Sequence, residues 1–155
     1  MPVFEVFATP GHDGKTVAFR FQRMGAAAVR AKPAMEAIAA VMFRAYGMTF
    51  ESQGRRGGGS WKRDSVEWLE RKMRNNLDPR IGHATLALRR SMSVPGAAHQ
   101  SLEIGNTFVH LSTDLPYAAV EQRERPFLRL LPGDKLAMRN IVRDYLLGTF
   151  RAARA

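Results

Sequence analysis

Residues 33–50, PAMEAIAAVMFRAYGMTF, carry the clearest helical pattern of the chain and decide its fold class. Apolar side chains recur there at i, i+3, i+4, i+7 and i+8, the spacing of one helix face: Ile38, Val41, Met42, Ala45 and Tyr46. Pro33 suits the first turn of a helix because its fixed φ is already helical and its missing N–H would have no partner there. The stretch is therefore predicted to be one long amphipathic helix.

Two β-hairpins are predicted on either side of this helix. Residues 3–8 and 16–22 are rich in Val and Phe, and the second run alternates apolar and polar side chains as a strand does. The residues between them include two glycines, a proline and an aspartate, which favour a turn. Residues 102–104 and 108–111 form a similar pair that turns at Gly105-Asn106.

Two shorter helices complete the prediction. One is expected to begin after Asp64, a good capping residue, and to end near Asn75-Asn76. Its apolar side chains share one face: Val66, Leu69 and Met73. The other begins at Asp134 and has an apolar stripe of Met138, Ile141, Val142, Tyr145 and Leu146. The sequence thus predicts an α+β fold, with a small antiparallel sheet packed against the long helix, a shorter helix and a C-terminal helix.

The 155 residues correspond to one ordinary domain, so residues 1–155 are expected to fold as a single unit. Residues 85–92 have no clear pattern, and either structural type remains open for them. Residues 52–63 contain four glycines around Arg55 and Arg56, and this much chain freedom predicts a flexible basic loop.

The charge balance favours an anionic partner. The chain has 24 Lys and Arg residues against 14 Asp and Glu residues, a formal net charge of +10. Such an excess suits nucleic acid or an acidic protein, although a merely soluble basic surface gives the same count. Mobility, cations and an aromatic ring meet in the Gly/Arg loop, which would suit phosphates: Arg55, Arg56, Trp61, Lys62 and Arg63. A loop that orders only against a neighbouring subunit is the alternative.

The sequence offers no catalytic or metal-binding pattern. Gly14-Lys15-Thr16 resembles the end of a P-loop, but residue 9 is Thr where that motif needs Gly, and a strand follows instead of a helix. There is no cysteine, and the four histidines never fall four residues apart around a carboxylate. We therefore expect no enzyme activity, no cofactor and no metal. Lacking a signal peptide or a membrane-spanning run, the chain is expected to be soluble and made in the cytoplasm.

Several short motifs follow one another in a fixed order over residues 36–148. A helix ending in Phe50 is followed by Gly59-Ser60-Trp61, a helix bearing Lys72, Thr85-Leu86-Ala87-Leu88-Arg89-Arg90-Ser91-Met92, Leu102-Glu103-Ile104-Gly105, Pro116-Tyr117-Ala118, Glu121-Gln122 and Arg125-Pro126-Phe127-Leu128. This order resembles the phage virion morphogenesis or tail-completion family, which includes the Mu G-like and head-tail neck proteins. The chain departs from that family at Leu86, where Gly is usual, and lacks the usual Gly soon after Glu121-Gln122.

The resemblance implies a non-enzymatic virion protein, made in the host cytoplasm, that forms a homo-oligomeric ring, commonly of six subunits. Such a ring acts as a tail-completion, tail-terminator or head-to-tail joining protein in the phage neck. It closes the tail tube, docks on the head connector and lets genomic DNA pass through its lumen without reading the bases. No membrane is involved.

The resemblance also suggests candidate interface residues. Tyr117 and Phe127 are expected to be packing anchors, Pro126 to lie beside them, and Arg125 to pair with carboxylates across a subunit boundary. Alternatively, these residues pin a loop to the core of their own subunit. The rival function is a monomeric basic nucleic-acid-binding protein whose loop from Arg55 to Arg63 grips phosphates.

Overall fold

Four antiparallel strands form one sheet in the computed structural model, which describes residues 6–10, 16–21, 31–81 and 86–148. Their order across the sheet is β1 (Val6–Pro10), β2 (Thr16–Phe21), β4 (Phe108–Thr113) and β3 (Gln100–Ile104). Each predicted hairpin is an antiparallel pair, and β2 and β4 join the two pairs in the middle of the sheet. Residues 3–5, residue 22 and residues 11–15 lie outside the described residues.

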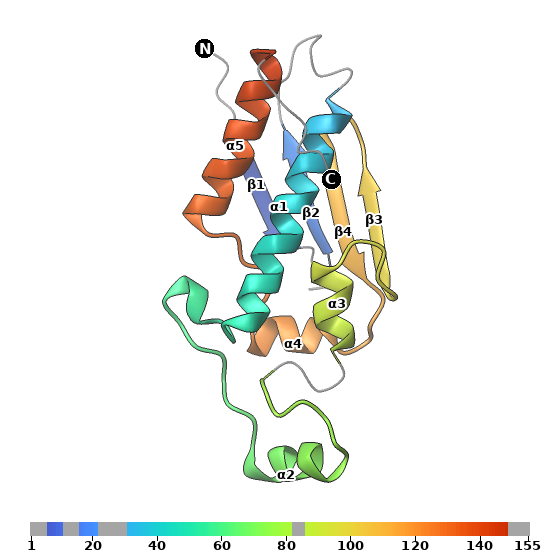
Figure 1. The fold of residues 1–155 in the computed structure, drawn as a ribbon, viewed down its shortest axis with the longest axis vertical. Coiled ribbons are helices and arrows are strands. Elements are labelled where there is room, and N and C mark those ends of the chain that lie inside the picture. The colour runs from blue at the N-terminus through green and yellow to red at the C-terminus, as the bar shows by residue number, and fades with distance from the viewer. Residues whose placement is uncertain (1–5, 11–15, 22–30, 82–85, 149–155) are drawn as a thin grey trace.

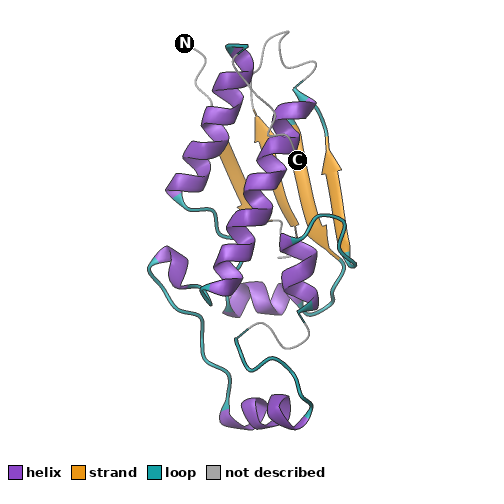
Figure 2. Ribbon diagram, viewed as in Figure 1, coloured by secondary structure: helices purple, strands orange, loops and turns teal. Residues whose placement is uncertain are grey.

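The predicted long helix is confirmed as α1, Lys32–Glu51. It lies across one face of the sheet, with α5 (Pro132–Leu146) beside it and the short helix α3 (Ala87–Ser93) near its C-terminal end (Figures 1 and 2). The core lies mainly between α1 and its neighbours, because the apolar face of α1 is fully covered. Its largest fully buried side chains include Tyr46, Phe50, Phe127, Met35, Ile38, Met42, Met92, Leu111 and Met138.

The C-terminal helix is also confirmed, with a small shift of its start. It begins at Pro132, and Asp134 stands in its first turn, where the carboxylate accepts a hydrogen bond of 2.8 Å from the Leu131 N–H. The predicted stripe faces the core, because Met138 and Val142 are buried and the other three members pack against them.

The predicted second helix is present as α2 (Val66–Arg74). Ser65, and not Asp64, caps it by accepting a hydrogen bond of 3.2 Å from the Trp68 N–H. Val66 and Met73 are 72% and 73% exposed, whereas Lys72, which lies about 100° from Met73 around the helix, is buried. The two ends of the apolar stripe are therefore exposed, its middle residue Leu69 is half-buried, and the lysine beside it faces inward.

Two elements fall where the sequence indicated only loop or no type. Helix α3 lies in the segment of unclear type, and α4 (Ala118–Glu124) lies in a charged stretch. Part of the predicted flexible loop has a defined conformation: a short 3-10 helix, η2 (Arg55–Gly57), follows α1, and the Trp61 N–H donates to the Gln53 carbonyl at 3.1 Å. Within the described residues, no helix has the length and apolarity needed to cross a membrane.

Candidate assembly site at the base of the arm

Residues 61–81, here called the arm, extend from the end of the molecule near α4. The arm carries α2, which stands apart from the sheet and from the other helices (Figure 1). Four charged side chains meet where the arm joins α4, and we call them the ion cluster: Asp64, Lys72, Glu121 and Arg125. The ion cluster ties the arm to α4.

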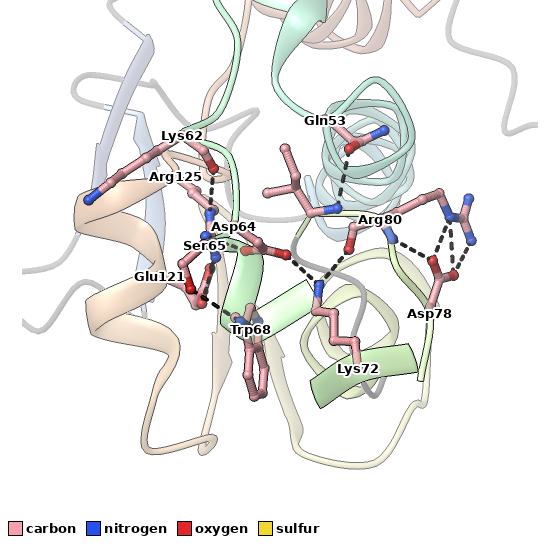
Figure 3. Close-up of polar contacts among 11 residues, drawn as sticks. Gln53, Lys62, Asp64, Ser65, Trp68, Lys72, Asp78, Arg80, Glu121 and Arg125 are labelled. Atoms are coloured by element: carbon pink, nitrogen blue, oxygen red, sulfur yellow. Dashed lines mark hydrogen bonds and ion pairs between the residues drawn. The ribbon is translucent and has the colours of Figure 1, made fainter. Parts of the chain in front are cut away.

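Asp64 is the centre of the ion cluster (Figure 3). One carboxylate oxygen accepts a bond of 2.6 Å from Lys72 Nζ, and the other accepts a bond of 2.6 Å from Arg125 Nη2. The Asp64 side chain is fully buried and that of Lys72 is 1% exposed. Lys72 Nζ also donates to the Arg80 carbonyl at 3.0 Å, so this buried amine has two acceptors.

Arg125 spans the joint between the arm and α4. Its Nη1 donates to both carboxylate oxygens of Glu121, at 3.1 and 3.0 Å, and its Nε donates to the Lys62 carbonyl at 3.1 Å. Every nitrogen of this guanidinium therefore has a partner within its own subunit. The expectation that Arg125 pairs with carboxylates of another subunit is replaced by the intramolecular alternative, because Asp64 and Glu121 occupy it.

The ion cluster contains two cations and two anions, so its formal charges cancel. Replacing a buried ion pair by apolar groups is often neutral for stability, whereas removing one partner is costly because a buried charge is left unpaired. The cluster therefore gives little net stabilisation but strongly favours one geometry. It holds α2 at a fixed angle to the body of the molecule.

Three aromatic rings pack together at the base of the arm. The Phe50 ring lies between Trp61 and Phe127, with ring centroids 5.3 Å from each. Trp61 Nε1 donates to the Pro126 carbonyl at 3.2 Å. Phe127 was expected to be an interface anchor. It is 1% exposed, so its ring belongs to the core of its own subunit. Burial of the Trp61 ring explains why the chain after η2 follows a defined path.

Arg56 fastens η2 to α5. Its guanidinium binds both oxygens of the Asp134 carboxylate, with Nη1 donating to Oδ2 at 2.8 Å and Nη2 donating to Oδ1. Burial alone would raise the pKa of Asp134. Hydrogen bonds from Arg56 and from the Leu131 N–H, together with the positive charges of Arg56 and Arg44, outweigh burial and hold this pKa below its usual value. Arg56 is thus engaged within the subunit, while Arg55 remains exposed.

The remaining candidate residues lie at the surface. Tyr117 is exposed where α4 begins, and Pro126 is exposed although its carbonyl is bound. Lys62 and Arg63 are exposed at the start of the arm, and neither side chain forms an ion pair with a described residue. The structure therefore brings Trp61, Arg125, Pro126 and Phe127 together, and leaves Tyr117 and the loop cations outward.

Sequence reasoning missed four residues of this site. Asp64 was interpreted as a helix cap, and Lys72, Glu121 and Gln122 were only motif residues without an assigned contact. The Gln122 side-chain oxygen accepts hydrogen bonds from the Phe127 and Leu128 N–H groups, both at 3.0 Å, and so fixes the chain after α4. No local pattern signalled these contacts, because Lys72 follows Leu69 by three residues and so lies only about 60° from the apolar stripe of α2.

The part of the chain that the structure describes contains no group of three or more His, Asp or Glu residues placed to hold a metal ion. Comparisons of the chain with protein-family models, with curated proteins and with solved structures found no match.

Proposed function

We propose that this protein is a structural subunit of a tailed-phage neck that forms a ring at the junction of head and tail. In this role it completes or terminates the tail, or joins it to the head, and DNA passes through the lumen of the ring. The proposal extends the resemblance of residues 36–148 to the tail-completion family.

One observation supports it most. Residues that carry the resemblance are far apart in the sequence yet form one connected group at the base of the arm: Trp61, Lys72, Glu121, Gln122, Arg125, Pro126 and Phe127. Motifs that matched by chance would have no reason to bond with one another. Their convergence supports a shared architecture in which these residues position the arm.

A second observation, at a departure from the family pattern, supports the same interpretation. Leu86 stands where the family usually has Gly, and its φ is +59°, in the left-handed region that favours Gly. The turn before α3 thus has the backbone conformation that the family residue would adopt, even though the side chain differs. This agreement is independent of the ion cluster.

The charge distribution fits a ring around DNA. Cations that form no ion pair with a described residue are spread over several elements, among them Arg44, Arg55, Lys62, Arg63 and Arg129. Individually such residues bind phosphate weakly, but a ring repeats them around one axis, and the contacts need no base recognition.

Sedimentation and DNA binding together test the proposal against the rival function. The purified protein is expected to sediment as a closed oligomer at high concentration, and its dispersed subunit is expected to bind duplex DNA weakly. A monomer at all concentrations that binds free DNA tightly, with a steep loss of affinity as salt rises, would overturn the proposal in favour of a monomeric nucleic-acid-binding protein. Replacing both Lys62 and Arg63 with Ala identifies whether the loop is responsible.

A further inference from the structure

Strand β3 is an open edge of the sheet. It is the last strand in the order β1-β2-β4-β3, and Figure 1 shows no described helix or strand on its outer side. Three of its residues are exposed and the two at its ends are half-buried: Ser101, Leu102 and Glu103, and Gln100 and Ile104. An edge of this kind presents backbone groups to which another strand can add.

The hydrogen bonds with β4 determine which backbone groups of β3 point to the open side. At the turn between the two strands, the Gly105 N–H donates to the Phe108 carbonyl at 3.0 Å. Hydrogen-bonded pairs alternate along an antiparallel ladder, so the odd-numbered residues of β3 bond to β4. The N–H and C=O groups of the even-numbered residues therefore point away from β4, and no residue that the structure describes bonds to them: Gln100, Leu102 and Ile104.

β3 lacks most of the features by which proteins block an exposed edge. It contains no Pro and no Lys, and it pairs with β4 along its whole length without a bulge. Its one charged residue is Glu103. Leu102 is 36% exposed although it pairs with the buried Leu111 and so lies on the core side of the sheet. By contrast β1, at the other end of the sheet, ends in Pro10, which has no N–H to donate.

The edge of β3 is complementary to itself about a two-fold axis at Leu102. A second copy turned by 180° about this axis runs antiparallel, so Leu102 pairs with Leu102, and Gln100 pairs with Ile104 twice. Each of these pairs exchanges two backbone hydrogen bonds, about six in all. The two Leu102 side chains meet on the core side. On the other face Glu103 lies opposite Ser101, whose hydroxyl is a donor for the carboxylate.

This register is better than the neighbouring registers that keep the same hydrogen-bond pattern. Sliding one copy by two residues in either direction leaves only two hydrogen-bonded pairs, and in one direction it sets Glu103 directly against Glu103. In the register centred on Leu102, the two Glu103 side chains lie on a diagonal about 7–8 Å apart. Both are exposed to solvent, which screens their charges.

We propose that two copies of this chain join their sheets edge to edge through β3, antiparallel and centred on Leu102. The contact uses the same strand on both sides, so a second copy supplies every group that it needs. Backbone hydrogen bonds provide the attraction, and Leu102 with the Ser101–Glu103 pairs fixes the register. The axis is perpendicular to the sheet, so the helices of both copies stay on one face. The contact does not depend on the neck function.

Cross-linking between two different positions tests the register. The chain has no cysteine, so each introduced thiol reports on one position. Residues 101 and 103 of two copies would form a non-hydrogen-bonded pair, whose Cα atoms lie about 4.5 Å apart, within the range of a disulfide. In the full-length protein, a mixture of Ser101→Cys and Glu103→Cys is therefore expected to form interchain disulfides about tenfold faster than either variant alone.

Glu36→Cys, an exposed position on α1, gives the background rate of cross-linking. Rates for the mixture that do not exceed those of the separate variants would overturn the proposal.

Replacing Leu102 in both cysteine variants tests whether backbone pairing holds the contact. The Leu102 N–H points to the open side, so Leu102→Pro removes a donor from the proposed contact but none from the bonds with β4. It is expected to reduce cross-linking of the mixture to the Glu36→Cys background. Leu102→Lys leaves the backbone free and sets two ammonium groups at the axis, so it should have the same effect. Urea unfolding verifies that each variant is folded, and cross-linking that persists in both would refute the contact.

Other outcomes identify other arrangements. If β3 pairs with β1 of another copy, the mixture shows no gain over the separate variants, and the two-fold contact is refuted. A protein that forms rings without cross-linking at β3 keeps the proposed function and loses this contact. A protein that cross-links at β3 but never forms a closed ring does the opposite.

Discussion

The buried amine of Lys72 helps to fix the orientation of the arm relative to the rest of the molecule. Lys72 is almost fully buried, yet its amine has two acceptors, Asp64 and the Arg80 carbonyl. A lysine is rarely buried without such partners, because removing an ammonium group from water is costly. The arm is therefore held by polar geometry more than by an apolar core, and changes at Lys72 should affect it first.

Lys72→Ala is expected to lower the free energy of unfolding by about 3 kcal/mol, because the buried Asp64 loses one of its two cations. Urea unfolding measures this change. Arg74→Ala is the matched control on the exposed face of the same helix and should change stability by less than about 0.5 kcal/mol. Limited trypsin digestion at the arm adds a local readout. Equal effects of the two substitutions would contradict the assigned role of the ion cluster.

Acid should weaken the fold through Asp134. Its pKa is lowered in the folded state, so its stabilising contribution is complete above the pKa of the unfolded chain and is lost as the pH falls through the folded value. Asp134→Asn is therefore expected to destabilise the protein at pH 7 and to lose less stability than the original chain between pH 7 and pH 3. Urea unfolding at both pH values checks this, with Glu124→Gln as an exposed control; an unchanged pH dependence in Asp134→Asn would refute it.

Leu86 holds a backbone conformation that costs a leucine about 1 kcal/mol. Its φ of +59° is one that glycine adopts freely, so Leu86→Gly is expected to raise the free energy of unfolding by roughly 0.5–1 kcal/mol. Leu86→Ala keeps the unfavourable φ and should give no gain. Thermal or urea unfolding of the two variants decides the point, and a Leu86→Gly variant less stable than Leu86→Ala would contradict it.

At the scale of elements, strong periodicity was predictable and short or polar segments were not. The apolar stripes of α1 and α5, with the strand patterns on either side of α1, sufficed to predict these two helices and the two hairpins of the sheet. Helix α4 was not predicted, because its seven residues are mostly charged or small. They make less than two helical turns, which is too short for an apolar stripe to repeat. The buried face of α2 was not predictable from its apolar stripe, because its one buried residue is a lysine, which the Asp64 carboxylate makes possible.

The turn after α1 depends on a glycine that admits an aromatic ring. Gly54 has φ +82°, and a Cβ there would lie 2.4 Å from Cδ1 of the buried Trp61. Gly54→Ala is expected to cost about 2–3 kcal/mol, since the ring has no room to move. Gly58→Ala, with φ +78° and open space around it, should cost only about 1 kcal/mol. Unfolding followed by Trp fluorescence compares them, and equal costs would show that Trp61 does not constrain the turn.

At the scale of the whole molecule, the fold is a sheet covered by helices on one face, with an arm that reaches away from it. The fold class was predictable from the sequence. The site was only partly so, because the ion cluster pairs residues 61 positions apart, Asp64 and Arg125, and no local pattern signals such pairing. Arg125 and Phe127 were candidate interface residues, and the structure shows contacts of both within their own subunit. Their replacement with Ala therefore tests folding and not assembly.

Electron micrographs of negatively stained protein, alone and mixed with isolated phage tails, test the central claim most directly. A neck ring subunit should give closed annuli of uniform diameter and tails capped at the end that meets the head. Single small particles at every concentration, with tail ends that stay bare after mixing, would contradict the proposed function.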